Sequence, residues 1–461
     1  MSQSTPLPAT GSSQNPGHTE IYTFEAPSHT PLCTAFYQLH AHPFGVGSNG
    51  RTAAVPIISN CLQLERDGTK RSVFGAGAGA SGERPLLLLG SGLVTLDLIF
   101  NNGLYQNILI LYDFFESLGY KCILLSHKPV PPASELGWLC RYTAVDIGKF
   151  LMAPPVQIFG YIEIAMSLDV ASREFFLKRG AFVTKLYLGN ALNIDVETTT
   201  IMKGFYIPHH NAGALDAIWT SPHYLQHLQY LQAINKTPRG EVVPYLWDSC
   251  FVEQNGVNRW SPAPGGWRTT DIVILEPNIS FQKHALYPLL LVEAFARRCS
   301  EWRGRVVLMN YDKLERSAHF VHEVLPSLTS IKGRIVTKGR ETLPDILRTN
   351  PHALFVTHNV NNDYNYMLFE LMDRGFPALH TSVGWKEYGY YWSTDRWDEA
   401  QNLLFDVLQN HTEREATYRS AAKQLAWQHS PWNPINRALW QEILERTKEA
   451  SSLSRRDEGD E

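Results

Sequence analysis

The sequence contains little that would define a cross-linked or membrane-bound protein. Its six cysteines, among 461 residues, are scattered and form no Cys-x-x-Cys pair, which favours reduced thiols over a disulfide framework or a zinc site. The longest apolar stretch, PLLLLGSGLVTLDLIF, is interrupted by Asp97 and is too short to span a bilayer. The start, MSQSTPLPATGSSQNPGHTE, lacks the basic and apolar regions of a signal peptide. We therefore expect a cytoplasmic protein without a transmembrane segment.

The charge is nearly balanced, with 41 Lys and Arg against 45 Asp and Glu and a net charge of −4. Nucleic-acid binding draws on clustered positive charge, and the chain has no basic stripe, so nucleic acid is not an expected partner. Hydrophobic residues make up 44% of the chain and aromatic residues 11%, which is enough for a large buried core. The length favours two or three domains.

The first 84 residues differ in composition from the rest of the chain and are interpreted as an extension. Residues 1–20 are rich in Ser, Pro, Thr and Gln, which is typical of disorder. The stretch FGAGAGASGER, residues 74–84, has two interpretations, a flexible linker or a phosphate-binding loop. No strand pattern precedes it and no Gly-Lys-Ser/Thr follows it. We therefore assign residues 1–84 to a disordered, low-complexity extension and linker.

Strand and helix patterns alternate over residues 85–252. The strand candidates are short apolar runs at 85–92, 121–126, 156–164, 182–188, 216–220 and 241–246. A helix pattern after the first run places apolar residues at helical spacing, namely Leu104, Ile108, Leu111, Phe115 and Leu118. Alternation of this kind is typical of a parallel sheet covered by helices.

The stretch 253–270 is rich in Gly, Pro, Asn and Trp and predicts a linker. The alternation resumes over residues 271–450, ends in long helices, and is followed by a charged tail, residues 451–461, that we expect to be loose. Strands are predicted at 271–278, 305–310, 333–337, 353–357 and 377–381, with helices at 285–299, 315–325, 341–348 and 364–374. We therefore predict an α/β protein with two Rossmann-like, doubly wound parallel-sheet domains.

The stretch NNDYNYMLFELMDRGFPALHTSVG, residues 361–384, places the carboxylate of Glu370 inside an apolar helix. A carboxylate on such a helix is either solvated or partnered. In open α/β sheets, ligands bind beyond the carboxyl ends of the strands. With two such domains, we expect the ligand site in the cleft between them, and Glu370 to face it.

This stretch resembles the donor motif of the retaining GT-B glycosyltransferases, in which a Glu, seven residues, a second Glu and Gly-x-Pro precede a Thr-Asp-x-Gly-like turn. The matching positions are Glu370, Gly375, Pro377, Thr381 and Gly384. The resemblance implies that Glu370 holds the ribose hydroxyls of the nucleotide and that Thr381 lies in the donor site. The family's first glutamate, which reads the sugar, falls on Asn362, so this sequence departs there. Asn362 and Asp363 can still hydrogen-bond sugar hydroxyls.

A second match lies in LEPNISFQKHALYPLLL. Retaining GT-B enzymes clamp the donor diphosphate with an Arg and, five residues on, a Lys. Lys283 matches the Lys, and Asn278 stands where the family has the Arg, which removes a bidentate phosphate ligand. The phrases VPYLWD, EPNIS and NDYNY also resemble uncharacterised bacterial GT-B-like proteins.

The residue types support a ligand site but leave a structural alternative open. One carboxylate can accept two ribose hydroxyl hydrogens, and a diphosphate suits a lysine beside a helix N-terminus. Alternatively, Glu370 is a solvated helix residue and Lys283 a surface lysine. His358, at the end of a predicted strand, is expected to line the same site.

The first domain offers four more candidates. Gly103, between a strand and a helix, allows a ligand to approach the backbone, or simply forms a tight turn. Glu163, inside an apolar strand, is either deeply paired or a catalytic base with a raised pKa. His209 and His210 are the other catalytic candidates. Because no third ligand follows at metal spacing, we predict no metal site.

We expect a metal-independent, retaining glycosyltransferase that moves a sugar from a nucleotide-sugar donor to a glycan, lipid or protein acceptor. It needs no cofactor beyond the donor substrate. Two alternatives stay open, a GT-B-fold nucleotide-sugar epimerase and a non-catalytic GT-B-like binding or structural protein. The Asn residues at positions 278 and 362 favour the second alternative. The sequence makes no prediction of the oligomeric state.

Overall fold

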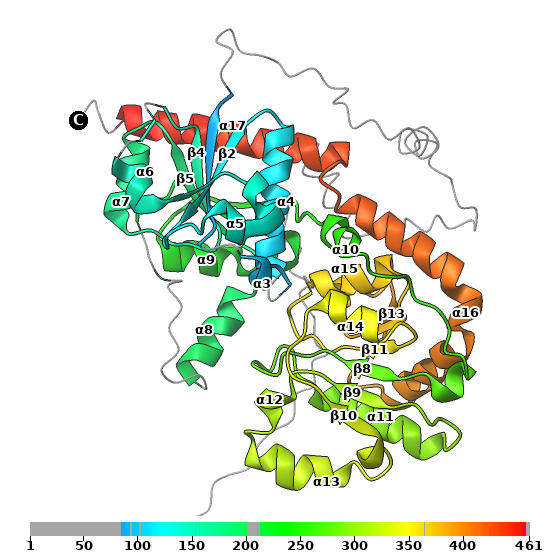
Figure 1. The fold of residues 1–461 in the computed structure, drawn as a ribbon. Helices are drawn as coiled ribbons and strands as arrows, with labels where there is room; N and C mark the ends of the chain where they lie inside the picture. The colour runs from blue at the N-terminus through cyan, green and yellow to red at the C-terminus, as the bar shows by residue number, and fades with distance from the viewer. Residues whose placement is uncertain are drawn as a thin grey trace, which may run out of the picture. The chain divides into compact units, whose positions relative to one another are not determined.

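The computed structural model describes residues 84–92, 95–100, 103–152, 154–155, 157–200, 210, 213–363 and 365–457. All of them belong to one of the two units into which the chain divides, Val55–Glu461. The predicted disordered extension therefore lies outside the described residues, apart from Arg84. The strands of the described part form two separate sheets (Figure 1).

The first sheet has seven parallel strands in the order β3-β2-β1-β4-β5-β6-β7. Its strands are β1 (Leu86–Gly90), β2 (Lys121–Ser126), β3 (Ala144–Asp146), β4 (Gly160–Glu163), β5 (Phe182–Tyr187), β6 (Ala217–Thr220) and β7 (Gly240–Val242). The chain moves outward from β1 in one direction and then in the other, which is the doubly wound Rossmann order. All but β3, a short edge strand, follow the apolar runs of the sequence.

Helices connect these strands. They are α3 (Leu96–Ile99), α4 (Gly103–Ser117), α5 (Ala133–Leu136), η1 (Gly137–Arg141), α6 (Ile147–Met152), α7 (Val170–Leu177), α8 (Ala191–Thr200), η2 (Pro222–His227), α9 (Leu228–Asn235) and α10 (Cys250–Gln254). Helix α4 buries Ile108, Leu111 and Phe115, as its periodicity predicts. It also buries two polar residues, Gln106 and Asn107, which donate to Glu370 and to the Tyr366 hydroxyl of the second half.

The second sheet has six parallel strands in the order β10-β9-β8-β11-β12-β13. Its strands are β8 (Ile272–Ile274), β9 (Val306–Leu308), β10 (Ile335–Thr337), β11 (Leu354–Val356), β12 (Ala378–His380) and β13 (Tyr390–Tyr391). The order repeats that of the first sheet. The predicted fold class, two Rossmann-like doubly wound sheets, is therefore confirmed. The edge strand β13 lies in an aromatic segment that gave no strand signal.

The helices of the second half are mostly those predicted. They are η3 (Gly266–Thr269), α11 (Leu286–Arg298), α12 (Tyr311–Leu314), η4 (Phe320–Val324), α13 (Leu325–Ser327), η5 (Lys332–Arg334), α14 (Leu343–Thr349), α15 (Tyr366–Asp373), η6 (Val383–Trp385), α16 (Trp397–Gln428) and α17 (Pro434–Asp457). The single helix expected over 315–325 is broken into short pieces. None of the described helices is long and apolar enough to cross a membrane.

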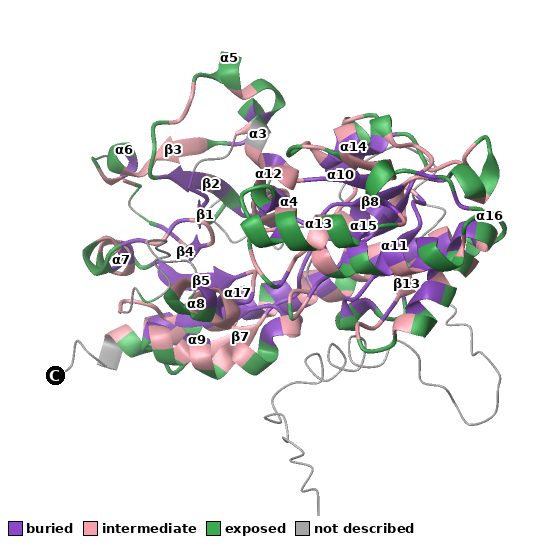
Figure 2. Ribbon diagram, turned by 90° about the horizontal axis from the view of Figure 1, so that it is seen from below, coloured by how far each residue is buried: buried purple, intermediate pink, exposed green. Residues whose placement is uncertain are grey.

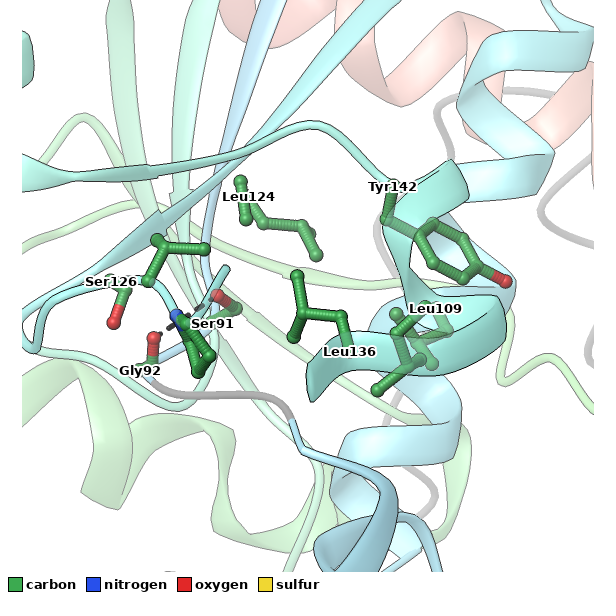
Figure 3. A pocket seen from close by; sticks show the side chains of 11 residues that line it. Ser91, Gly92, Leu109, Leu124, Ser126, Leu136 and Tyr142 are labelled. Atoms are coloured by element: carbon green, nitrogen blue, oxygen red, sulfur yellow. Dashed lines mark hydrogen bonds between the residues drawn. The ribbon is translucent and has the colours of Figure 1, made fainter. Parts of the chain in front are cut away.

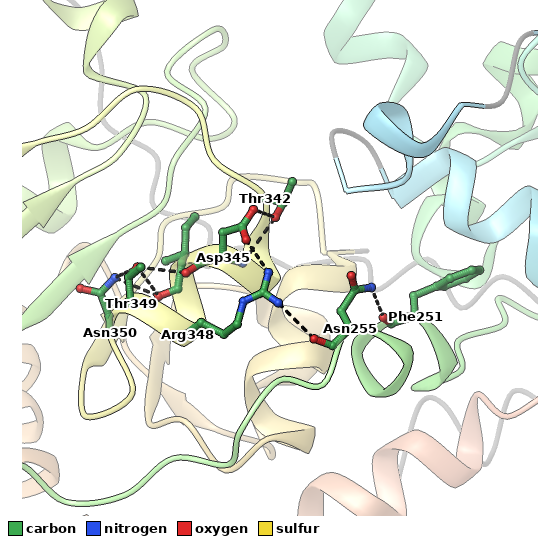
Figure 4. Close-up of polar contacts among 8 residues, drawn as sticks. Phe251, Asn255, Thr342, Asp345, Arg348, Thr349 and Asn350 are labelled. Atoms are coloured by element: carbon green, nitrogen blue, oxygen red, sulfur yellow. Dashed lines mark hydrogen bonds and ion pairs between the residues drawn. The ribbon is translucent and has the colours of Figure 1, made fainter. Parts of the chain in front are cut away.

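Helix α14 shows how local signals and a longer contact fix one element (Figure 4). The Thr342 hydroxyl accepts a hydrogen bond from the Asp345 N–H and so caps the helix N-terminus. From the last turn, Arg348 donates to the Asn255 carbonyl at 3.1 Å. This contact ties the helix to the segment after α10, where the chain passes from the first half to the second.

Helix α17 returns to the first half. Trp440 packs against Phe114, Phe115 and Trp219, and its ring N–H donates to the Pro244 carbonyl. The sequence grouped this helix with the second domain because that domain precedes it in the chain. The charged tail, expected to be loose, is helical as far as Asp457.

The core of each half lies at its sheet, whose inner strands are buried along their length (Figure 2). Both faces of a parallel sheet are covered, so such strands are continuous apolar runs. One apolar cluster contains residues of both halves. Trp247 stacks on Phe369 and Tyr245 lies against Tyr366, each pair at 5.3 Å between ring centroids. These contacts bring α15 against the first half.

Candidate functional site

The polar residues of interest gather where the strands of the second sheet end. Glu276 follows β8 by two residues, His358 follows β11 by two residues, and Thr381 comes directly after β12. Strands β8, β11 and β12 are adjacent and parallel. Their carboxyl ends therefore meet at one edge, which is where doubly wound sheets bind ligands. We call this the donor edge.

Glu276 is a buried carboxylate that the sequence analysis missed. It is 1% exposed, and its Oε1 accepts a hydrogen bond from the His358 N–H at 2.8 Å. Burial raises the pKa of Glu276 to about 7, against the opposing effect of the Lys283 charge. Burial also lowers the pKa of Lys283, and Glu276 counteracts this. A carboxylate directly after an apolar strand, in LEPN, was the available signal.

The predicted diphosphate residues lie on the loop between β8 and α11. Asn278 has a left-handed backbone, with φ of 56°, and its Oδ1 accepts from the Ala285 N–H at 2.8 Å. It therefore caps the start of α11 with one end of its amide and leaves the other end available. Lys283 is half-buried on the same loop, so it is not the surface lysine of the alternative interpretation.

His358 is a neutral histidine at the donor edge. It is 1% exposed, its ring stacks on Tyr287 at 4.6 Å between centroids, and burial lowers its pKa to about 4. A neutral imidazole offers one hydrogen-bond donor and one acceptor.

Several buried polar atoms at this edge have no hydrogen-bond partner among the described residues. They are Glu276 Oε2, Asn278 Nδ2, Gln282 Oε1, Asn359 Oδ1 and both ring nitrogens of His358. A backbone hydrogen bond from Val360 N–H to the Gln282 carbonyl, at 2.9 Å, joins the two loops that carry them. A buried polar group without a partner costs roughly 1–3 kcal/mol, so a polar ligand that reached these atoms would gain from hydrogen-bonding them.

The other predicted residues of this edge are held by protein partners. Asn362 Oδ1 accepts from the Tyr224 hydroxyl at 2.9 Å. Burial raises the pKa of Asp363, although backbone N–H groups of 383–384 hydrogen-bond its carboxylate and act against that rise. The Thr381 hydroxyl accepts from the Asn359 N–H at 2.7 Å and donates to the Asn359 carbonyl. Thr381 thus fixes the loop after β11 to the end of β12.

Glu370 is buried, not solvated. It is 3% exposed, and its Oε1 accepts a hydrogen bond from Gln106 Nε2 of α4 at 3.0 Å. Burial raises the pKa of Glu370 to about 8. Its helix neighbours Leu371 and Met372 are buried in the core, as expected. The carboxylate therefore faces the first half of the protein.

The first-half candidates are dispersed. Glu163 is 1% exposed and forms two hydrogen bonds with the Arg173 guanidinium, at 2.8 and 2.9 Å. His210 is exposed and pairs with Asp195 at 3.1 Å, and His209 lies outside the described residues. Gly103 begins α4, where an added Cβ would lie 3.1 Å from the Tyr366 ring. The close approach of α4 to α15 therefore accounts for this glycine. The catalytic roles of Glu163 and His210 stay predictions.

A separate recess lies at the carboxyl ends of β1 and β2 (Figure 3). Its lining is largely apolar, with Leu109, Leu124, Leu136 and the ring of Tyr142, and with the hydroxyls of Ser91 and Ser126. Ser91 is already engaged, because its Oγ donates to the Leu125 carbonyl at 3.0 Å. No group of three or more His, Cys, Asp or Glu residues in the described part of the chain could hold a metal ion.

Solved structures share this architecture. The chain matches HepE from Anabaena, in complex with UDP, at 12% identity and a TM-score of 0.51, over 78% of this chain and 99% of that one. It matches the α,α-trehalose 6-phosphate synthase of Burkholderia multivorans at 8% identity and a TM-score of 0.50, over 80% and 99%. The two doubly wound sheets and these matches show a GT-B fold.

Another solved structure and a family model also match this chain. The pneumococcal O-GlcNAc transferase GtfA matches at 15% identity and a TM-score of 0.37, over 62% of this chain, and the chain spans only 56% of that protein. A family model described as "Protein of unknown function (DUF2827)" matches residues 95–444. That is most of the chain, which therefore belongs to the DUF2827 family. No curated protein matches it.

Proposed function

We propose that this protein is a glycosyltransferase that takes a sugar from a nucleotide-sugar donor bound at the donor edge. One observation carries the proposal: buried polar atoms without a described partner collect on the loops after β8 and β11. Those of Glu276, Asn278 and Gln282 lie on the loop that also carries Lys283 and precedes the N-terminus of α11, and those of His358 and Asn359 lie on the loop after β11. Donors, acceptors and a positive charge at a helix start are the features that recognise a sugar diphosphate.

In this proposal each residue has a distinct task. Lys283 and the positive end of the α11 dipole neutralise the departing diphosphate, while Asn278 offers a neutral donor where an arginine would supply charge. The Glu276 carboxylate accepts hydrogen bonds from sugar hydroxyls, and neutral His358 hydrogen-bonds the sugar or phosphate oxygens. Glu370 holds the ribose hydroxyls after Gln106 gives up its hydrogen bond.

UDP is the first nucleotide to test, because HepE, which shares the fold, was crystallised in complex with UDP. Retention of the anomeric configuration follows from the donor motif around Glu370. Lys283 and the dipole of α11 supply the positive charge that a metal would otherwise provide, so transfer is proposed to be metal-independent. The acceptor is a glycan, a lipid or a protein.

A thermal-shift panel of UDP, GDP, ADP and their sugar conjugates, with and without EDTA, tests the proposal. A nucleotide at a hundred times its Kd stabilises the protein by about 2.7 kcal/mol. We expect one nucleoside diphosphate to raise the Tm in the presence of EDTA, and the control variant Lys332→Ala, at an exposed lysine of the second half, to behave like the parent.

The same panel separates the alternatives. Absence of any shift with every nucleotide would favour a non-catalytic GT-B-like protein. A donor that is converted to an isomeric nucleotide sugar without an added acceptor would instead indicate an epimerase.

A further inference from the structure

A carboxylate from the first half occupies the loop assigned to the diphosphate. Glu197, on α8, is 2% exposed, and its Oε1 accepts from the Ser280 hydroxyl at 2.7 Å and from the Phe281 N–H at 2.9 Å. Its Oε2 accepts from Gln282 Nε2 at 3.2 Å. Three donors on consecutive residues therefore converge on one anion.

The three donors form an anion-binding site, and a side chain of the protein itself, the Glu197 carboxylate, occupies it. A backbone N–H, a hydroxyl and an amide, just before a helix, are groups that also bind phosphate oxygens. The two oxygens of the Glu197 carboxylate stand where two oxygens of a phosphate would accept the same hydrogen bonds. Lys283, the proposed diphosphate cation, follows Gln282 directly in the chain.

Glu197 and a diphosphate exclude each other on electrostatic grounds. Among the described residues no cation forms an ion pair with Glu197, and its carboxylate accepts hydrogen bonds from three neutral donors. A second anion placed beside it would face like charge at low dielectric, where repulsion is strong. The diphosphate can bind only after Glu197 leaves.

Helix α8 has few contacts that would oppose its movement away from the loop at residues 280–282. Ala191 and Glu197 are the buried residues of this helix, and Val196 is half exposed. Polar contacts also hold the helix: Asp195 pairs with His210 and accepts from the Tyr230 hydroxyl, and Asn190, just before the helix, donates to the Asn361 carbonyl at 2.7 Å. Ala191 is the one fully buried apolar residue of α8 and packs in a small cluster with Tyr187, Ile218 and Leu231, so little fully buried apolar area opposes displacement of the helix. The Asp195 contacts keep the helix attached to the first half.

We propose that Glu197 is an autoinhibitory latch, a built-in carboxylate that occupies the diphosphate subsite until a nucleoside diphosphate displaces it. The proposal rests on the function proposed above and adds a regulatory step to the same site. A latch lowers apparent affinity by the fraction of molecules in which the site is open, so removing it strengthens binding.

Titration of UDP, GDP and ADP by calorimetry into the parent, Glu197→Ala and Glu197→Gln tests the latch. We expect Glu197→Ala to bind the preferred nucleoside diphosphate about ten-fold more tightly than the parent. Glu197→Gln keeps the shape but loses the charge, so it should also bind more tightly, by a smaller factor. Glu174→Ala, at an exposed glutamate of α7, is the matched control and should bind like the parent.

Amide hydrogen exchange supplies a second measurement. In the parent, the preferred nucleotide should increase exchange in α8, residues 191–200, because the helix loses its contact with residues 280–282. Unchanged or weaker binding by Glu197→Ala, or increased protection of α8 by nucleotide, would overturn the latch and leave the proposed function intact. If the parent and both variants bind none of the nucleotides, the proposed function fails and the latch fails with it.

Discussion

Glu163 and Glu370 are buried carboxylates on apolar elements, one in each half, and they differ in their partner. Glu163 meets the guanidinium of Arg173 through two hydrogen bonds, whereas Glu370 meets the neutral amide of Gln106 through one. A paired carboxylate completes a structural unit in the first half. The carboxylate of the second half keeps unused capacity to accept hydrogen bonds and a pKa raised to about 8 by burial. The two buried carboxyl groups therefore differ in the chemistry of their partners and not in burial.

Removing the charge of Glu163 should give the largest effect on stability. In Glu163→Gln, Arg173 stays buried without its counter-charge, which costs roughly 3–5 kcal/mol of the free energy of unfolding. Urea denaturation of the purified variant measures this. The double variant Glu163→Gln with Arg173→Met should recover part of the loss. A cost below about 1 kcal/mol would show that the pair contributes little.

Glu370→Gln should change how stability depends on pH. Below its ordinary pKa of 4.5 the carboxyl group is protonated in the folded and the unfolded protein alike. Between 4.5 and about 8 the unfolded chain loses this proton while the folded protein keeps it, so wild-type stability falls as pH rises. The variant should lack this fall and gain on the order of a few kcal/mol relative to wild type at pH 8. Equal pH profiles of the free energy of unfolding for the two proteins would contradict the burial of Glu370.

The same substitution should weaken nucleotide binding. A glutamine side chain has one acceptor oxygen where the carboxyl group has two, so it cannot accept from both ribose hydroxyls. Above pH 8, where the carboxyl group of the folded protein is ionised, the loss of roughly 1.5–3 kcal/mol corresponds to about ten- to a hundred-fold weaker binding. Comparison of ribo- and deoxyribonucleotides by calorimetry locates the effect, because Glu370→Gln should remove any preference for the ribonucleotide. Parent-like affinity would take Glu370 out of the ribose site.

Lys283→Ala should separate diphosphate from monophosphate binding. We expect about ten-fold weaker binding of a nucleoside diphosphate, or about 1.4 kcal/mol, and a smaller change for the monophosphate. Lys332→Ala serves as the control at an exposed position. Equal losses for both ligands would place the lysine away from the second phosphate.

Removal of a hydrogen-bonded polar group outside the donor edge should lower stability without changing nucleotide affinity. Thr342→Ala removes the cap of α14 and should cost about 1 kcal/mol of the free energy of unfolding, with nucleotide affinity unchanged. Thermal unfolding measures the loss of stability, and calorimetry on the same preparation measures the nucleotide affinity. A change in nucleotide affinity would mean that α14 couples to the donor edge.

The sequence by itself determined the two doubly wound sheets. Inner strands such as β1 and β5 are buried on both faces, so they appear as continuous apolar runs, and the helices between them carry the 3.6-residue period. The short edge strands β3 and β13 gave no signal, because an edge strand needs no such run. The family motif likewise indicated Glu370 and Lys283, since local spacing fixes their places relative to strand and helix ends.

Only the tertiary structure decided which residues meet. The pairing of Glu163 with Arg173 depends on how α7 packs on β4, and the contact of Glu370 with Gln106 joins residues far apart in the chain. The return of α17 to the first half depends on the packing of Trp440 against Phe114, Phe115 and Trp219. The same holds for Glu197, which lies on a helix with little amphipathic character and with no motif around it. Its proposed role depends on its contacts with the loop at residues 280–282. Local sequence specifies secondary structure because its interactions are short-range, whereas the partner of a buried charge is set by long-range packing.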